Sequence, residues 1–306
     1  MRRSLVGAAV VGALALGAGA VAFTSVTDGD ARTCLAGELP PPPSGRGEVL
    51  PATPAAADAD ADAVAPAVYE VEVLARYPHD TEAFTQGLVV HDGLLLEGTG
   101  GYGTSDVRAV DLASGEVLAR QALPGQLFGE GLARHGDRLF QLTWQDQEGF
   151  IRDACTLDVV GEFTYDGEGW GLASDGELLW RSDGTATLTA HDPETLDVVR
   201  TVEVTDRGEP VLRLNELEVV GGELLANVWL TDSIARIDLG TGTVTGWVDA
   251  AALTDEVAPT DVDDVLNGIA ATDDGDRLWL TGKRWSTVFE VRVVPGGELP
   301  PPAGGE

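Results

Sequence analysis

The sequence has few basic residues, little sulfur and few of the residues that favour helices. Lys and Arg total 19 against 51 Asp and Glu, which gives the 306 residues a formal net charge of −32. Such a surface repels phosphate groups, so binding to nucleic acids or to anionic lipid is disfavoured. Lys, Gln and Met are scarce, whereas Gly reaches 39 residues. This balance favours strands joined by tight turns, and we expect no sustained helix.

Cysteine and histidine are too few and too scattered to indicate a zinc site. Only Cys34 and Cys155 occur, and no paired Cys or His spacing matches a zinc motif. A disulfide between the two cysteines is allowed by the sequence but not required by it. The histidines mostly stand beside Asp or Gly, and we expect exposed turn positions for all of them: His79, His91, His135 and His191.

Both ends of the chain lack the patterning of a folded core. Residues 1–25 place two arginines before a run of small and apolar residues, the layout of an export signal or an uncleaved anchor. Residues 26–66 are rich in Pro, Ala and Asp, and residues 295–306 form a similar tail, as in disordered linkers. The folded domain is predicted at 67–294. We expect an extracytoplasmic protein, either secreted or tethered by its N-terminal segment, with membrane contact only if that segment stays uncleaved.

One phrase recurs five times within this domain. Each copy has a short strand, a polar turn and an apolar run: FTQGLVVHDGLLLEGTG, FGEGLARHGDRLFQLTW, EGWGLASDGELLWRSDG, RLNELEVVGGELLANVW and VLNGIAATDDGDRLWLTG. Aligned on one apolar position, the copies are 44, 40, 45 and 52 residues apart. A second hairpin follows each copy, and four strands per repeat of roughly 40 to 50 residues is typical of a propeller blade. The sequence therefore predicts an all-β, five-bladed β-propeller, closed by pairing of VYEVEVLARYPHD with STVFEVRVV.

Equivalent positions of the repeat place polar side chains around the predicted axis. The first strand of each blade lines the central channel of a propeller. Two residues before the aligned apolar position, the copies carry the five residues that we call the ring: Gln86, Glu130, Trp170, Asn215 and Asn267. Four polar members out of five suit a binding site better than a core.

The second strands of the copies are expected to end at the same rim. There the sequence offers Glu97, Trp144, Asp183, Trp229 and Lys283. Three tryptophans with Phe84 and Phe128 nearby indicate an aromatic pocket. Lys283 is the one cation of this set, and pairing with Glu97 or Asp183 would be its ordinary structural role.

Ten motifs occur in a fixed order along the domain: FTQGL, EGTGGYG, FGEGL, QLTW, EGWGL, SDGT, LNELE, ANVW, DVLNGIA and TGKRW. In this order they resemble the plant and bacterial type of glutaminyl-peptide cyclotransferase. The resemblance implies a five-bladed propeller that converts the N-terminal Gln of peptides or proteins to pyroglutamate and releases ammonia. It implies that Glu130 is the catalytic acid/base. It also implies which residues line the substrate site: Gln86, Phe84, Phe128, Trp144, Trp170, Asn215, Trp229 and Lys283. The ring position adds Asn267 to this set.

The implied reaction needs proton transfer, because an α-amine with a pKa of about 7.7 to 8.0 is largely protonated at neutral pH. Ionised Glu130 can take that proton and pass it to the departing amide nitrogen. Gln86, Asn215, Lys283 or an indole N–H can stabilise the oxyanion. We expect a monomer that requires no cofactor, with room in the channel for a structural calcium. Two other functions fit the same residues: a calcium-dependent, lactonase-like hydrolase and a non-catalytic propeller that binds peptides.

Overall fold

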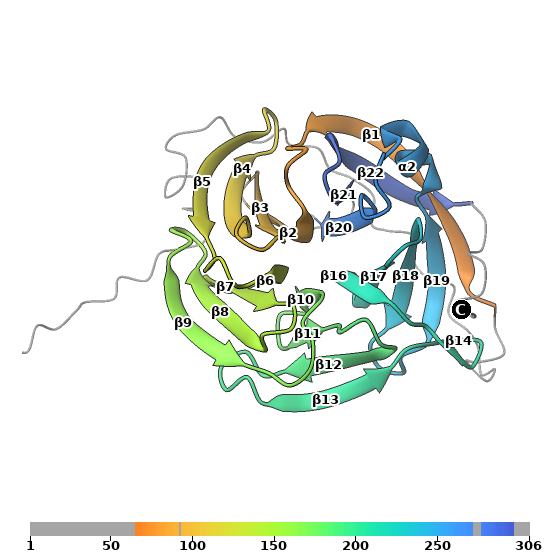
Figure 1. Cartoon of the computed structure of the whole chain (residues 1–306). Coiled ribbons are helices and arrows are strands. Elements are labelled where there is room, and N and C mark those ends of the chain that lie inside the picture. The colour runs from red at the N-terminus through yellow and green to blue at the C-terminus, as the bar shows by residue number, and fades with distance from the viewer. Residues whose placement is uncertain (1–64, 92, 272–276, 297–306) are drawn as a thin grey trace, which may run out of the picture.

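The computed structural model describes residues 65–91, 93–271 and 277–296, and nearly all of its regular structure is strand (Figure 1). The one helix in these ranges, α2 (Ala251–Val257), has seven residues and buries Leu253. The expectation of no sustained helix is therefore confirmed, with this one short exception between β19 and β20. The first strand, β1, begins at Ala67 and the last, β22, ends at Pro295.

Three sheets follow one plan, in which four antiparallel strands pair in sequence order. The first sheet contains β2 (Thr85–His91), β3 (Leu94–Thr99), β4 (Asp106–Asp111) and β5 (Glu116–Ala122). The second contains β6 (Gly129–His135), β7 (Arg138–Thr143), β8 (Glu148–Asp153) and β9 (Val159–Thr164). The third contains β10 (Leu172–Ser174), β11 (Leu179–Arg181), β12 (Thr187–His191) and β13 (Val198–Glu203). The two hairpins predicted for each repeat are present in all three sheets.

A fourth sheet has eight strands in the order β16-β17-β18-β19-β1-β22-β21-β20. Its strands are β16 (Leu214–Val220), β17 (Glu223–Val228), β18 (Ser233–Asp238), β19 (Val244–Asp249), β20 (Leu266–Ala271), β21 (Leu278–Gly282), β22 (Thr287–Pro295) and β1 (Ala67–Pro78). β1 pairs antiparallel with β22, as the sequence predicted. It also pairs in parallel with β19, which the sequence did not predict. A small hairpin of β14 (Thr205–Asp206) and β15 (Glu209–Pro210) precedes this sheet.

The first strands of the five repeat copies meet around a central axis (Figure 1). β2 contacts β6, β6 contacts β10, β10 contacts β16, β16 contacts β20, and β20 contacts β2. The strands thus form a closed circle, while β5, β9, β13 and β19 lie at the periphery. This arrangement confirms an all-β, propeller-like fold.

Glycine lets the inner strands approach one another. A side-chain carbon at Gly87 would lie 2.3 Å from the backbone nitrogen of Leu132, and one at Gly171 would lie 2.0 Å from the carbonyl oxygen of Asn215. No side chain fits at such distances, so packing requires the glycine that follows the ring residue in the first three copies, whereas Gly268 in the fifth copy is required by its φ of +127°. Apolar clusters fill the space between neighbouring sheets farther out, as where Leu188 of β12 and Leu224 of β17 share one cluster.

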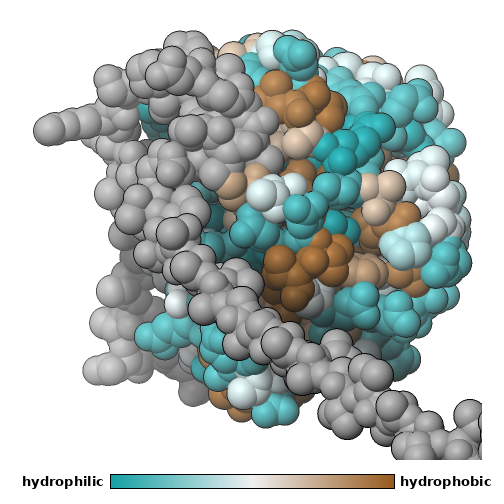
Figure 2. Space-filling model, turned by 90° about the vertical axis from the view of Figure 1, so that its left-hand side faces the viewer, coloured by the Kyte–Doolittle hydropathy of each residue, from teal (hydrophilic) through white to brown (hydrophobic). Residues whose placement is uncertain are grey.

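The side of the molecule formed by β5 and β9 is mostly hydrophilic, with apolar surface in separate patches (Figure 2). Val159 and Val160, at the start of β9, are among the exposed apolar residues of the chain. Within the described ranges no helix has the length and apolar character needed to cross a bilayer.

The predictions for the ends of the chain concern residues that the structure does not describe. The proposed export signal, nearly all of the linker, and the tail from residue 297 onward fall outside the described ranges, as does Cys34. Cys155 lies in the turn between β8 and β9 and is disulfide-bonded.

Candidate active site

Four of the five ring residues lie at irregularities in the pairing of their strands. The register shifts at the positions of Gln86, Glu130, Asn215 and Asn267. Residues two apart in a regular strand share a face, which would place Gln86 with Leu88 in the core. A bulge breaks this alternation and re-aims the side chain. Each of these four copies thus contains a buried apolar position and a β-bulge that turns the polar ring residue away from the core.

Hydrogen bonds connect three ring residues in a row. Asn267 Nδ2 donates to Oε1 of Gln86 at 3.2 Å and to the carbonyl oxygen of Thr85 at 2.9 Å. Gln86 Nε2 then donates to Oε1 of Glu130 at 2.9 Å. The side chains of all three ring residues are buried. One amide therefore holds Glu130, and a second amide fixes the orientation of the first.

Burial dominates the electrostatics of Glu130, which is only 5% exposed. Burial raises the pKa of Glu130 well above its ordinary value, attraction to Lys283 partly opposes this, and repulsion from Glu168 adds to it. A carboxyl group with such a pKa exchanges protons closer to neutral pH than an exposed glutamate does. This is the property that a proton-transferring group requires.

Lys283 is the only lysine of the chain, and it is buried within electrostatic reach of Glu130. Its Nζ lies 4.7 Å from the ring centroid of Phe84. Burial lowers the pKa of Lys283, while attraction to Glu130 and Asp263 acts in the opposite direction. The single lysine of a strongly negative chain therefore acts electrostatically on Glu130, the carboxyl group of the candidate site whose pKa is raised.

Aromatic rings form a wall around these polar groups. Phe84 meets Phe128 edge to face with 6.0 Å between ring centroids, and Phe128 meets Trp144 with 5.9 Å. Trp170 and Trp229 make another edge-to-face pair at 5.6 Å. All five side chains are half-buried. The predicted aromatic residues are thus brought together, in two groups.

Glu168 joins the two aromatic groups, and the sequence patterns did not single it out. Its Oε2 accepts the indole N–H of Trp144 at 2.8 Å and that of Trp170 at 2.9 Å. Its Oε1 accepts a hydrogen bond from Nε2 of Gln145 at 2.9 Å. Burial acts to raise the pKa of Glu168, but the bonds from Trp170, Gln145 and Trp144 prevail and lower it. Glu168 is therefore ionised at neutral pH.

A signal for Glu168 was present in the repeat. In the aligned copies Glu168 stands where the first two copies carry Phe84 and Phe128, so a carboxylate replaces an aromatic ring at the rim. Tyr102, in the motif EGTGGYG, is a second residue that the patterns missed. Its ring centroid lies 5.4 Å from that of Phe128, and the residue is 57% exposed at the outer edge of the wall.

Glu97 does not lie at the rim, and this expectation was wrong. The rim residues Trp144, Trp229 and Lys283 share one backbone hydrogen bond: the N–H group of each donates to the carbonyl oxygen of the residue two places before the ring residue of its copy. In the first copy the N–H group of Gly100 makes the equivalent bond, so Gly100 occupies the rim position. Glu97 lies three residues earlier, inside β3. A side-chain carbon at Gly100 would come within 2.3 Å of the ring of Phe128, so the first copy has no rim side chain.

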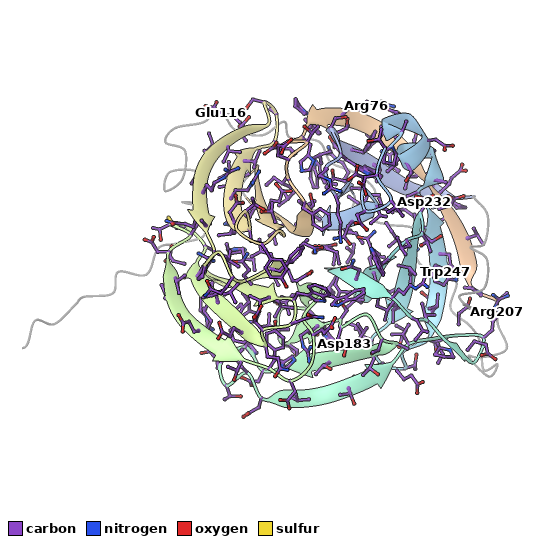
Figure 3. The ribbon with its side chains drawn as sticks, in the orientation of Figure 1. Arg76, Glu116, Asp183, Arg207, Asp232 and Trp247 are labelled. Atoms are coloured by element: carbon purple, nitrogen blue, oxygen red, sulfur yellow. The ribbon has the colours of Figure 1, made fainter. Side chains whose placement is uncertain are left out.

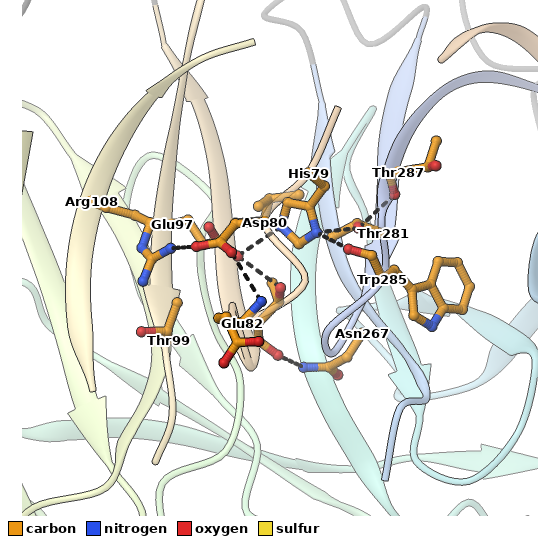
Figure 4. A network of polar contacts seen from close by, with 12 residues as sticks. His79, Asp80, Glu82, Glu97, Thr99, Arg108, Asn267, Thr281, Trp285 and Thr287 are labelled. Carbon is orange, nitrogen blue, oxygen red and sulfur yellow. Dashed lines mark hydrogen bonds and ion pairs between the residues drawn. The ribbon is translucent and has the colours of Figure 1, made fainter. Parts of the chain in front are cut away.

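Glu97 instead belongs to a buried polar network behind the ring (Figure 4). Its Oε1 accepts a hydrogen bond from Oγ1 of Thr85 at 2.7 Å and lies 3.0 Å from Nε2 of His79. The Nδ1 atom of His79 bonds the carbonyl oxygen of Trp285 at 2.7 Å. Burial acts to lower the pKa of His79, but Glu97 and the Trp285 carbonyl raise it overall. The network reaches the ring through Thr85, whose carbonyl oxygen bonds Asn267.

Asp183 accepts hydrogen bonds from the backbone nitrogen and Oγ1 of Thr185. The charges that act on Lys283 belong to Glu130, Asp263 and Arg284, so the alternative in which Lys283 pairs with Glu97 or Asp183 finds no support among the described residues. Figure 3 shows Asp183 closer to the central axis than Glu116, which lies at the periphery of the molecule. Histidines were expected at exposed turns, but the structure buries two of them: His79 and His191.

Two buried amide oxygens at the ring have no hydrogen-bond partner, Oδ1 of Asn215 and Oδ1 of Asn267. A buried acceptor without a donor costs about 1 to 3 kcal/mol, so a ligand that supplies an N–H group or a cation to either oxygen gains from it. Within the described ranges, no three or more Asp, Glu, His or Cys side chains gather as a metal centre.

The candidate site is electrically polarised. Lys283 follows β21 and Glu168 precedes β10, which belong to repeat copies that do not touch in the circle of inner strands. Glu130 interacts electrostatically with both. The arrangement suits a substrate that carries a cationic group near Glu168 and develops negative charge near Lys283, with one carboxyl group able to move a proton between them.

Comparison with known proteins agrees with this chemistry. The family model for glutamine cyclotransferase matches residues 48–293. A glutaminyl-peptide cyclotransferase of Arabidopsis thaliana is 43% identical over 230 residues, which cover 74% of this chain and 72% of that protein. The crystal structure of Myxococcus xanthus glutaminyl cyclase matches with a TM-score of 0.72 at 42% identity, covering 74% of this chain and 98% of that one. The range of the family match includes every residue of the pocket.

Proposed function

Because this chain belongs to the glutamine cyclotransferase family, we propose that it converts the N-terminal glutamine of peptides and proteins into pyroglutamate and releases ammonia. The observation that carries the proposal is the position of Glu130. It is a buried carboxyl group of raised pKa, held by Gln86 and coupled to one cation and one anion. In enzyme terms the reaction is an intramolecular aminoacyl transfer.

The ring closes when the α-amine attacks the side-chain amide carbon of the same residue. The new C–N bond forms, and the bond to the amide nitrogen breaks. Much of the entropic barrier is absent, because both groups belong to one residue. Glu130 takes the proton that the amine must lose and delivers it to the departing nitrogen, which leaves as ammonia. Burial supports this role because it brings the pKa of Glu130 closer to that of the amine.

We assign stabilisation of the oxyanion to Lys283. Several other candidates are occupied, since Trp144 and Trp170 donate their indole N–H groups to Glu168 and Gln86 donates to Glu130. A cation in a water-poor pocket stabilises developing negative charge far more than it would in water. Asn215 supplies its unpartnered oxygen as an acceptor for an N–H group of the substrate.

The propeller that we propose has five blades, one for each copy of the repeat. The eight-stranded sheet would then be two blades, β16–β19 and β20–β22, with β1 serving as the outer strand of the second. The closed circle of five inner strands supports this count. We also keep the expectations of a monomer and of an extracytoplasmic location, which light scattering and mass spectrometry of the mature N-terminus would test.

Ammonia release tests the proposal directly. The purified protein is incubated with a peptide that begins with glutamine, and ammonia and peptide mass are followed over time. We expect ammonia and cyclised peptide in equal amounts, and none from the same peptide acetylated at its N-terminus. Absence of ammonia from the free peptide would reject the proposal.

Chelation separates the proposal from its alternatives. EDTA abolishes the activity of a calcium-dependent, lactonase-like hydrolase, whereas cyclisation by side chains alone continues without a cofactor. A calcium ion with only a structural role would lower the melting temperature on removal and leave turnover of the folded protein unchanged. A non-catalytic peptide binder would release no ammonia under either condition.

A further inference from the structure

Glu168 retains capacity to bind one more donor. It accepts three hydrogen bonds, two on Oε2 and one on Oε1. An ionised carboxylate offers about four lone-pair sites, so one site on Oε1 is left for a further donor. The side chain is half-buried, which keeps it within reach of a molecule that enters the pocket.

The surroundings of Glu168 suit a cationic donor. Trp144 and Trp170 hold their indole N–H groups on the carboxylate, and Trp229 packs against Trp170. Indole rings attract ammonium groups through their faces, and a carboxylate supplies the matching charge. A carboxylate bordered by tryptophans therefore recognises an ammonium group better than a neutral or anionic one.

The segment that carries Glu168 is held in place from behind. The guanidinium group of Arg181 donates to the carbonyl oxygens of Glu168 and Asp166, and it lies 4.9 Å from the ring centroid of Tyr165. The hydroxyl oxygen of Tyr165 accepts the backbone N–H of Thr143 at 3.0 Å, next to Trp144. Such support positions a binding group before the ligand arrives.

We propose that Glu168 binds the α-ammonium group of the substrate's N-terminal residue and thereby restricts the enzyme to peptides with a free amino terminus. The reaction that follows rests on the proposed function: the ammonium group bound at Glu168 gives one proton to Glu130, and the freed amine attacks the amide carbon. Glu130 delivers this proton to the departing nitrogen, which leaves as ammonia, and then takes the second proton from the new ring nitrogen and releases it to solvent. Lys283 repels the ammonium group and attracts the amide oxygen, so the two charged residues orient the substrate between them. Acetylated or internal glutamine lacks the cation that Glu168 recognises.

Binding of a peptide that cannot react tests this role apart from turnover. A glycine-initiated peptide carries the ammonium group but has no amide to cyclise, and its N-acetylated form is the matched control. Calorimetry on the wild-type protein should show tighter binding of the free form by about 10- to 100-fold, the range expected for a hydrogen bond between charged groups. In Glu168→Gln this preference should nearly vanish, and an unchanged preference would overturn the proposal.

Trp144→Phe separates recognition from a purely structural role. This change removes one indole N–H bond to Glu168 and keeps an aromatic ring. If Glu168 only oriented the tryptophans, both variants would lose the preference equally, and the proposal would fail. We expect Trp144→Phe to keep most of it. Should Glu168→Gln not fold, Glu168→Asp must weaken the preference without removing it.

Kinetics on glutamine-initiated peptides gives an independent readout. Glu168→Gln should raise KM more than it lowers kcat. It should also move the acid limb of kcat/KM to lower pH, because the repulsion that helps to raise the pKa of Glu130 disappears. An acid limb that stays in place or moves to higher pH would contradict the proposal. Absence of ammonia release by the wild-type protein would reject the proposed function, and the binding test on Glu168 would still be decisive.

Discussion

Glu130 and Glu216 are both buried carboxyl groups on inner strands of the circle, but their surroundings differ. Glu130 occupies the ring position of β6 and accepts a hydrogen bond from the side chain of Gln86. Glu216 follows the ring position of β16, where the other copies have glycine. Its oxygens accept the backbone N–H groups of Ile269 at 2.8 Å and Leu88 at 3.3 Å. Burial raises the pKa of both groups well above the ordinary value.

The difference teaches that burial alone does not make a reactive carboxyl group. Glu130 has the cation Lys283 within electrostatic reach and is also repelled by Glu168, which binds two of the tryptophans. Glu216 has the like-charged Glu218 nearby, and its oxygens are bound to the backbones of β2 and β20. We therefore assign proton transfer to Glu130 and a structural role to Glu216, which joins three inner strands where glycine would leave a gap.

The largest difference in kcat should appear when Glu130 and Glu216 are each replaced by glutamine in separate variants. Glu130→Gln keeps the shape of the side chain and removes the proton shuttle, so kcat for a glutamine-initiated peptide should fall by about 10² to 10⁴-fold. Glu216→Gln leaves acid/base catalysis intact, and kcat per folded molecule should stay close to the wild-type value. Ammonia assays with circular dichroism as the folding control measure both. Equal losses in the two variants would remove the distinction between them.

An intermediate effect is expected when the cation beside Glu130 is removed. Lys283→Met should lower kcat by about 10² to 10³-fold, as loss of an oxyanion donor does. The acid limb of kcat/KM should also move to higher pH, because the attraction that lowers the pKa of Glu130 is lost. Lys283→Arg keeps the charge and is the matched control. If the limb did not move in Lys283→Met, Lys283 would not act on Glu130.

The smallest effect concerns stability near Glu216. Burial raises the pKa of Glu218 to about 8, above that of an unfolded glutamate at about 4.3. The resulting stability is fully present below about pH 4.3 and is lost as pH rises through about 8. Glu218 is only half-buried, and solvent screening weakens the electrostatic effect of such a group. We therefore expect a loss of stability on the order of 2 kcal/mol, less than the full pKa shift would give at about 1.4 kcal/mol per pKa unit.

Glu218→Gln should abolish this part of the pH dependence. Urea unfolding of both proteins at pH 4 and pH 9, in the presence of EDTA, would measure it. If wild type and variant lost the same stability between pH 4 and pH 9, the pKa of Glu218 would not be raised in the folded protein.

The repeat made the fold and the ring predictable, because each copy carries its own alternation of apolar and polar residues. Position within the copy was enough to bring Gln86, Glu130, Asn215 and Asn267 to the axis, although a regular strand would have turned them into the core. Pairing between distant segments was only partly predictable. The β1–β22 pair closes an edge that the sequence leaves open, whereas the parallel β1–β19 pair depends on where the two strand ends come to lie in space.

The errors at the site have one physical cause, which is that a side chain's partners come from other strands. Glu97 looked like a rim residue by sequence spacing, but its oxygen is bonded to His79 and Thr85. Glu168 was not singled out by the sequence patterns, because its role depends on two indole groups that meet only in the folded circle. Sequence position identified the strands that carry the site, and contacts between strands decided which side chains face it.

The most direct test of the central claim is the pH dependence of kcat/KM for the wild-type protein and Glu130→Gln with the same glutamine-initiated peptide. The claim is that ionisation of buried Glu130 controls proton transfer. The wild type should show an acid limb with a pKa well above 4.5, the ordinary value for glutamate. The residual activity of Glu130→Gln should lack that limb. A limb of the same pKa in both proteins would contradict the account.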